Sequence, residues 1–133
     1  MSKKETPLIR QYWKQRGGTL IEEFPAVRAT KTNSNRWIDA IIIKQEEHRI
    51  AHHTEINRRG KDIIIVQAKA SRLGMYLMGQ VLFSKKLMES FDPNSMESIA
   101  LCKKDDSVLR PLLEAYSNCK VVVLENSEDE NAA

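Results

Sequence analysis

Two apolar runs constrain the fold of this chain more than any other feature of its sequence. Residues 36–43 (RWIDAIII) and 62–70 (DIIIVQAKA) are rich in β-branched side chains, with few polar interruptions. Continuous runs of this kind are typical of interior strands that are covered on both faces. They therefore predict a sheet with helices on both sides.

The segments around these two runs predict an α/β domain with a mixed central sheet. Apolar spacing and the Gly, Pro and Asp positions predict helices over 7–16, roughly 73–90 and 105–116, and strands over 19–24, 36–43, 62–70, 96–103 and 120–124. Pro25 is expected to stop the first strand, and the polar residues 44–61 to extend the two central strands as a hairpin. We expect residues 1–124 to form one domain, followed by a disordered acidic tail over 125–133.

Composition and charge exclude several classes of protein. No apolar stretch approaches the roughly 20 residues of a membrane span, and the basic N-terminus lacks the apolar segment of a secretory signal. Cys102 and Cys119 have no CxxC spacing, which favours buried thiols in a cytoplasmic protein. The net charge is +3, and it would be +7 without the four acidic residues of the tail. A basic body suits a polyanionic partner, and equally an ordinary solvated surface.

Polar side chains interrupt both apolar runs. Asp39 lies inside the first run, while Gln67 and Lys69 lie two residues apart at the end of the second. Strand alternation puts Asp39 on the side of Ile41, and one register between neighbouring strands brings Asp39 beside Gln67 and Lys69. A lone buried charge is costly, so each group then needs a partner or an ion. An Asp39–Lys69 salt bridge at a sheet edge and a metal site are the two interpretations.

A metal site of this composition suits phosphodiester hydrolysis. That reaction needs a carboxylate at one strand end, a second oxygen ligand on the next strand and a nearby lysine. A bound metal polarises a phosphoryl oxygen and lowers the pKa of an attacking water. The lysine orients that water or stabilises charge in the transition state. Oxygen ligands favour Mg²⁺ or Mn²⁺ over zinc.

These residues resemble the signature of the PD-(D/E)XK nuclease superfamily. Asp39 matches its aspartate, and Gln67-Ala68-Lys69 matches its (D/E)xK motif as a QxK variant. The expected elements are similar to the restriction endonuclease-like core (helix, three strands, helix, strand), and the resemblance spans roughly residues 7–103. Gln80, on the following helix, matches a glutamine of RecB-like members. The resemblance implies that Asp39, Gln67, Lys69 and Gln80 are the catalytic residues.

The chain departs from the family pattern at its second ligand and at its upstream acid. A glutamine at position 67 offers a carbonyl oxygen to a hard cation but brings no charge. Relatives often add an acid from the first helix, where only Glu5 is available, and Glu22 or Glu23 on the first strand are alternatives. We favour Glu22, so the predicted metal ligands are Asp39, Gln67 and Glu22, with Mg²⁺ or Mn²⁺ as the cofactor.

The resemblance implies a metal-dependent nuclease that hydrolyses phosphodiester bonds, with DNA favoured over RNA as the substrate. Basic residues flanking the site are expected to contact the nucleic-acid backbone, namely Arg36, Arg58, Arg59 and Lys61. The alternative is a catalytically weak or inactive nuclease-fold protein that binds nucleic acid or a partner protein. A homodimer is compatible with either function.

Overall fold

The computed structural model describes residues 4–124, so the tail predicted over 125–133 lies outside the described residues. One six-stranded sheet organises them, in the order β3-β1-β2-β4-β5-β6. The elements are α1 (Glu5–Arg16), β1 (Thr19–Val27), β2 (Arg36–Ile43), β3 (Ile50–Ala51), β4 (Asp62–Arg72), α2 (Met75–Met88), a 3₁₀ turn (Glu89–Phe91), β5 (Ser95–Lys104), α3 (Leu109–Glu114) and β6 (Cys119–Val123). Within this part of the chain, no helix has the length and apolar character needed to cross a membrane.

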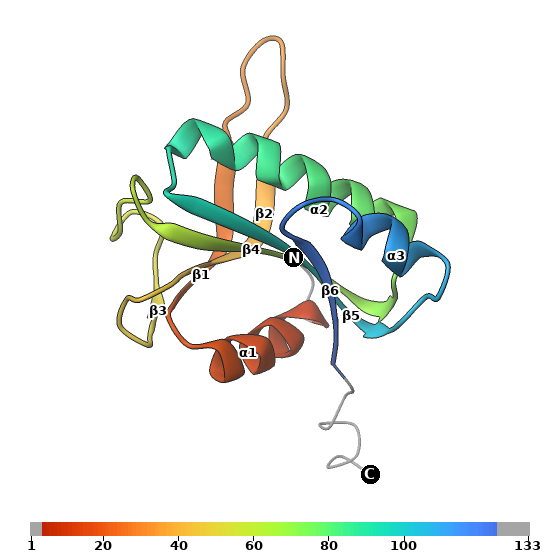
Figure 1. Cartoon of the computed structure of the whole chain (residues 1–133). Coiled ribbons are helices and arrows are strands. Elements are labelled where there is room, and N and C mark those ends of the chain that lie inside the picture. Colours follow the sequence, from red (N-terminus) through yellow and green to blue (C-terminus); the bar gives the residue numbers. More distant parts are fainter. Residues whose placement is uncertain (1–3, 125–133) are drawn as a thin grey trace.

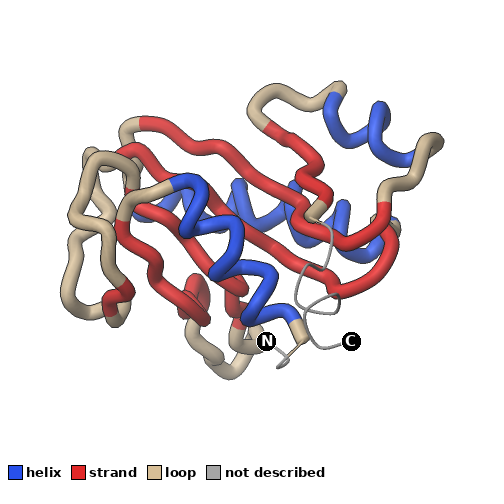
Figure 2. The backbone as a smooth tube through the Cα atoms, turned by 90° about the horizontal axis from the view of Figure 1, so that it is seen from below, coloured by secondary structure: helices blue, strands red, loops and turns tan. Residues whose placement is uncertain are grey.

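The strand directions confirm the prediction of a mixed sheet flanked by helices. β2 pairs antiparallel with β1 and β4, whereas β5 runs parallel to β4 and β6. The parallel pairs are joined through α2 and α3, since parallel neighbours need a crossover that returns over a face of the sheet. α1 lies across one face and α2 across the other (Figures 1 and 2).

Burial on both faces accounts for the continuous apolar runs of the central strands. Ile64 and Val66 of β4 pack in one core cluster with Ile9 of α1. Ile63 and Ile65 of the same strand pack on the opposite face, in a cluster that also contains the end of α2. Because neither face meets solvent, these strands carry no regular polar alternation.

The predicted stop of the first strand at Pro25 is wrong, since β1 continues to Val27 and Pro25 pairs with Trp37 of β2. On its other side, β1 pairs with β3 only at Leu20 and Ile21. Beyond Ile21 no described strand pairs with that edge, so a residue without an N–H is tolerated there.

The segment 44–61 also differs from its prediction. It does not extend the two central strands as a hairpin. Instead the chain returns to the edge of the sheet, where β3 runs parallel to β1. The Leu20 N–H donates to the Arg49 carbonyl at 2.9 Å, which ties this return to β1.

Regular strand alternation fails near the middle of β1 and β2. Ile38 of β2 shares a core cluster with Ile41, three residues away, and so takes the side that alternation predicts for Asp39. In β1, Glu23 has a φ of 51°, in the left-handed region that non-glycine residues seldom adopt. The prediction that Asp39 lies on the side of Ile41 is therefore wrong, and the irregularity falls next to the candidate site.

Candidate functional site

The candidate site lies where β2 and β4 stop pairing. The last partners in their ladder are Ala40 and Val66, and Asp39 and Gln67 are the next residues on each strand. The Asp39 N–H donates to Gln67 Oε1 at 3.2 Å, and Asp39 Oδ2 accepts from the Ala68 N–H at 2.9 Å. Side chains thus continue the hydrogen bonding where the backbone ladder ends. The predicted proximity of Asp39 and Gln67 is confirmed.

Gln67 links the point where β2 and β4 separate, at Asp39 and Gln67, to helix α2. We call this point the fork. The Gln67 side chain is buried, and its Nε2 donates to the buried Ser84 Oγ at 2.7 Å. Because Oε1 accepts from Asp39, both ends of the amide have a partner and its orientation is fixed. The buried amide of Gln67 therefore has its hydrogen-bonding groups satisfied by Asp39 of β2 and Ser84 of α2.

Glu5 brings a second carboxylate to the same edge of β4. From the first turn of α1, Glu5 Oε2 accepts from the Ala70 N–H at 2.9 Å. Ala70 lies two residues beyond Ala68, and alternate N–H groups of a strand point to the same side. With a rise of about 3.3 Å per residue, the two bound amides are roughly 7 Å apart along the strand. Asp39 and Glu5 therefore occupy successive positions along this edge.

The electrostatic environment of Asp39 disfavours its charged form. Burial raises the pKa of the Asp39 carboxyl above its ordinary value, and the hydrogen bond from Ala68 opposes this rise. The charges of Glu5 and Glu23 raise the same pKa further. Glu23 and Asp39 lie between the paired positions Glu22–Ala40 and Phe24–Ile38 of β1 and β2, and both line one cavity of about 290 Å³. Two acidic neighbours around a desolvated carboxylate form a site that a cation would stabilise.

The donor groups fit a hard divalent cation in part. Over residues 4–124, no cluster of three or more His, Cys, Asp or Glu side chains is arranged to hold a metal. Mg²⁺, however, is commonly held by one or two carboxylates, with water and substrate phosphate completing its coordination. Asp39 and Glu5 would supply those carboxylates. Gln67 is better placed to position Asp39, since its oxygen already accepts the Asp39 N–H.

Other predicted site residues lie apart from this pair of carboxylates. Glu22, the favoured third ligand, forms a two-point ion pair with Arg10 of α1, at 2.9 and 3.0 Å. Glu5, one of the alternatives to Glu22, is the residue that reaches β4. Lys69 is exposed at the end of β4, with its side chain available to solvent and ligand.

Gln80 lies in a larger groove beside the fork. The groove has a volume of about 760 Å³, and Gln80 and Gln67 both line it. Tyr76 and Ser84 line it as well, one helical turn to either side of Gln80. Gln80 thus faces the same cavity as Gln67, while Asp39 lines the smaller cavity. Trp37 lines both cavities and so lies between them.

Arg58 and Lys61, which are two of the four predicted nucleic-acid contacts, are held by protein groups. Arg58 lies over the rings of Phe24 and Phe91, at 5.1 and 5.3 Å, and its Nη1 donates to two backbone carbonyls. Lys61 forms an ion pair with Glu46 at 2.6 Å. Burial lowers the pKa of Arg58, as expected for a guanidinium enclosed by aromatic rings.

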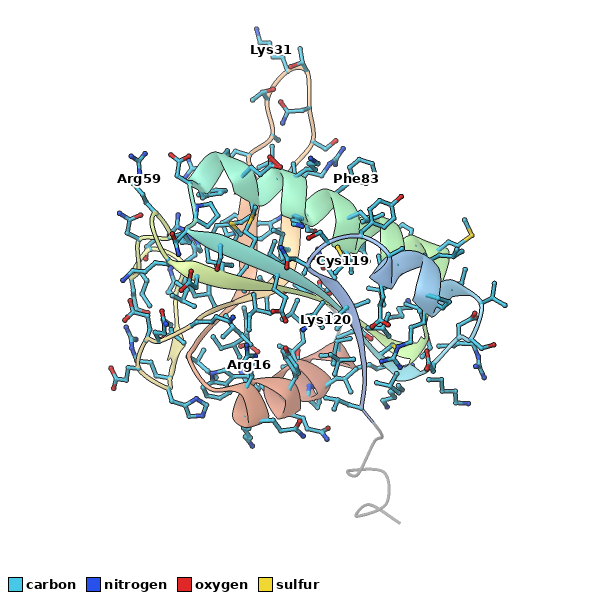
Figure 3. The ribbon with its side chains drawn as sticks, in the orientation of Figure 1. Arg16, Lys31, Arg59, Phe83, Cys119 and Lys120 are labelled. Carbon is cyan, nitrogen blue, oxygen red and sulfur yellow. The ribbon has the colours of Figure 1, made fainter. Side chains whose placement is uncertain are left out.

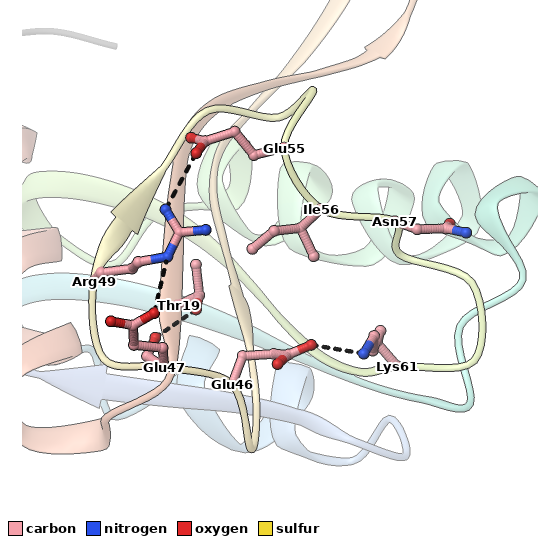
Figure 4. Close-up of a pocket in the computed structure, with 8 residues that line it drawn as sticks. All are labelled: Thr19, Glu46, Glu47, Arg49, Glu55, Ile56, Asn57 and Lys61. Carbon is pink, nitrogen blue, oxygen red and sulfur yellow. Dashed lines mark hydrogen bonds and ion pairs between the residues drawn. The ribbon is translucent and has the colours of Figure 1, made fainter.

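Lys61 also lines a polar cavity of about 310 Å³ under the 44–61 segment (Figure 4). The charged residues that line this cavity pair with one another, since Arg49 contacts Glu47 at 3.5 Å and Glu55 at 3.2 Å. Of the four predicted contacts, Arg36 and Arg59 are exposed, and Arg59 lies 3.2 Å from Asp92. Only Arg36 lines the groove beside the fork.

Asp39→Asn should become more stable relative to the wild type as the pH rises. A carboxyl whose pKa is raised by folding destabilises the folded state progressively, from its unfolded-state pKa near 3.8 up through its folded-state pKa. The asparagine keeps an acceptor for the Ala68 N–H and cannot ionise. Urea unfolding of both proteins in EDTA, at a series of pH values from about 4 to 7, measures the difference.

The opposite trend would contradict this electrostatic account. If Asp39→Asn instead lost stability relative to the wild type as the pH rose, a cationic side chain would be stabilising the ionised Asp39, as in the salt-bridge interpretation. Asp62→Asn is a matched control, because hydrogen bonds from Ser95 and Asn94 lower the pKa of Asp62. Asp62→Asn should therefore become less stable relative to the wild type as the pH rises.

Comparison with known proteins gives no significant match to a family model, to a curated protein or to a solved structure. Function is therefore inferred from the arrangement of the described side chains. Two carboxylates accept from alternate N–H groups of β4, an amide links the fork to α2, and a groove with exposed aromatic side chains lies beside it.

Proposed function

We propose that this protein is a Mg²⁺- or Mn²⁺-dependent nuclease of the PD-(D/E)XK type that cleaves DNA at the fork between β2 and β4. The observation that carries the proposal is that Asp39 and Glu5 accept from the N–H groups of Ala68 and Ala70, which are alternate residues on one edge of β4. Their carboxylates are preorganised by backbone donors before any ligand binds. Carboxylates fixed in this way could hold a metal ion, whose positive charge would stabilise the phosphoryl transition state.

Each residue has a distinct role in this proposal. Asp39 and Glu5 would hold the metal ion, which when bound polarises the phosphodiester and acidifies the attacking water. Gln67 holds Asp39 in position through the Asp39 N–H, and Ser84 fixes the Gln67 amide. Lys69, exposed two residues beyond Gln67, would orient the water or stabilise developing negative charge.

The second candidate is a weak or inactive nuclease fold retained for binding, and Gln67 favours it. Both ends of its amide are engaged by protein groups, and it adds no negative charge to the site. A site with two carboxylates binds Mg²⁺ mainly when substrate phosphate completes the coordination. Cleavage of a substrate in the presence of metal would favour the nuclease. Binding of metal or nucleic acid without any cleavage would favour the non-catalytic candidate.

Glu5 and Glu22 provide a matched pair for testing the catalytic assignment. Glu5→Gln and Asp39→Asn should each lower metal-dependent cleavage about 100-fold or more, because each removes charge aimed at the metal. Glu22→Gln should leave the rate close to wild type, since the Glu22–Arg10 ion pair is part-exposed and contributes little to stability. The assay uses single- and double-stranded DNA and RNA with Mg²⁺, Mn²⁺ or EDTA. Equal losses from Glu5→Gln and Glu22→Gln would contradict the assignment of Glu5.

Gln67→Glu should bind Mg²⁺ about tenfold more tightly than the wild type. The new carboxylate can still accept from the Asp39 N–H, and the Ser84 hydroxyl can turn to donate to it. Its charge attracts a dication, and after desolvation a gain on the order of 1–2 kcal/mol remains. Without metal, the added buried charge should lower the melting temperature.

Calorimetric titration with Mg²⁺, and melting curves with and without Mg²⁺, test Gln67→Glu. Gln80→Glu is the control, since it adds the same charge in the groove without contact to Asp39 in the described structure. Unchanged Mg²⁺ affinity in Gln67→Glu would place Gln67 outside the metal site. Tighter binding without cleavage of any substrate would favour the non-catalytic candidate.

A further inference from the structure

The groove between α2 and the start of β2 exposes large apolar side chains beside the candidate site. Trp37 is 58% exposed, Tyr76 81% and Phe83 70%, and all three line this cavity. Its volume of about 760 Å³ lies within the range of roughly 300–1,000 Å³ found for ligand sites. Aromatic rings this exposed, gathered in one groove, indicate a binding surface.

The positions of Tyr76 and Phe83 follow from the two faces of α2. Leu77 and Val81 face the sheet and are buried. Tyr76 and Phe83, seven residues apart, lie two turns from each other on the opposite side of the helix, with Gln80 between them. Figure 3 shows Phe83 on the outer side of α2. The rings are therefore held on a rigid element and contribute little to the core.

The charge and polarity of the groove favour a polyanion with flat, hydrogen-bonding groups. Arg36 and Lys86 line it, and none of the described residues lining it is acidic, while Lys86 Nζ lies 3.5 Å from Glu89, which does not line it. Asn35 and Gln80 add amide donors and acceptors. Lys31 lies at the tip of the 28–35 loop, which projects past α2 (Figure 3), and does not line the groove.

We propose that this groove binds unpaired bases of single-stranded nucleic acid. Tyr76 and Phe83, about 10 Å apart along α2, stack on two bases of one strand, and Arg36 and Lys86 contact the phosphates. Stacking platforms within a basic groove are the usual means of holding a single strand, because every base has a π-face. A duplex keeps those faces inside its own stack and cannot use the rings.

This inference rests on the proposed function for its biological meaning, since it names the substrate class of the same site. Trp37 borders both this groove and the cavity that contains Asp39 and Glu23. A strand whose bases stack along α2 therefore has its backbone next to the fork. The substrate would be single-stranded, or a duplex with unpaired nucleotides at the point of cleavage.

Binding in EDTA tests the groove separately from catalysis. Fluorescence anisotropy with labelled 20-mers of dT and rU, and with a matched duplex, should show at least tenfold tighter binding of the single strands. Tyr76→Ala and Phe83→Ala should each weaken single-strand binding about tenfold. Tyr116→Ala is the matched control, because Tyr116 is 57% exposed beyond α3 and does not line the groove, and it should bind like the wild type. Quenching of tryptophan emission by the strand, lost in Trp37→Phe, would report stacking at the groove.

Three results would overturn the inference. They are duplex binding as tight as single-strand binding, unchanged affinity in Tyr76→Ala and Phe83→Ala, or concentration-dependent dimers of the wild type that those variants abolish. The last result would identify a self-association surface. The wild type should bind single strands through this groove in EDTA, where no metal-dependent cleavage occurs. If it does so, yet cleaves no substrate when Mg²⁺ or Mn²⁺ is present, the proposed nuclease activity fails and the groove assignment stands.

Discussion

The end of the β2–β4 ladder is the constraint on which the rest of the candidate site depends. Where β2 separates from β4, the N–H groups of Ala68 and Ala70 lose their strand partner and must be satisfied in another way. Carboxylates of Asp39 and Glu5 accept these hydrogen bonds. A protein needing only structural acceptors has neutral choices, such as Asn or Ser. Here both acceptors are acids, and burial, together with the charges of Glu5 and Glu23, raises the pKa of Asp39, which supports the proposal of a cation at the fork.

The sequence predicts the sheet well because its central strands are defined by local composition. The runs 36–43 and 62–70 form β2 and β4, and Asp39 meets Gln67 as expected for neighbouring strands. Glu5 could only be named as one of three candidate acids, because its approach depends on how α1 docks on the sheet. Glu22, the favoured acid, instead pairs with Arg10, and the left-handed backbone at Glu23 interrupts β1 beside it. Glutamate gives no local signal for such a conformation.

Gln67 shows how one side chain can serve structure and function together. Its amide joins β2, β4 and α2, so a stable fold needs a hydrogen-bonding residue at this position. The same contacts hold α2 against the sheet at Ser84, and so determine where the outer face of α2 lies. The groove with Tyr76 and Phe83 is thus positioned by the residue that positions Asp39. Under the proposed function, metal binding at Asp39 and strand binding in the groove would both depend on this amide.

Paramagnetic broadening by Mn²⁺ tests the central claim most directly, because it locates a dication without requiring any activity. Amide signals of Ala68 and Ala70 in ¹⁵N spectra should broaden at the lowest Mn²⁺ concentrations. Signals of Ile63 and Ile64, at the other end of β4, should broaden much later. Asp39→Asn should remove this selectivity. Equal broadening along β4, or broadening centred on other acidic residues, would contradict a dication site at the fork between β2 and β4.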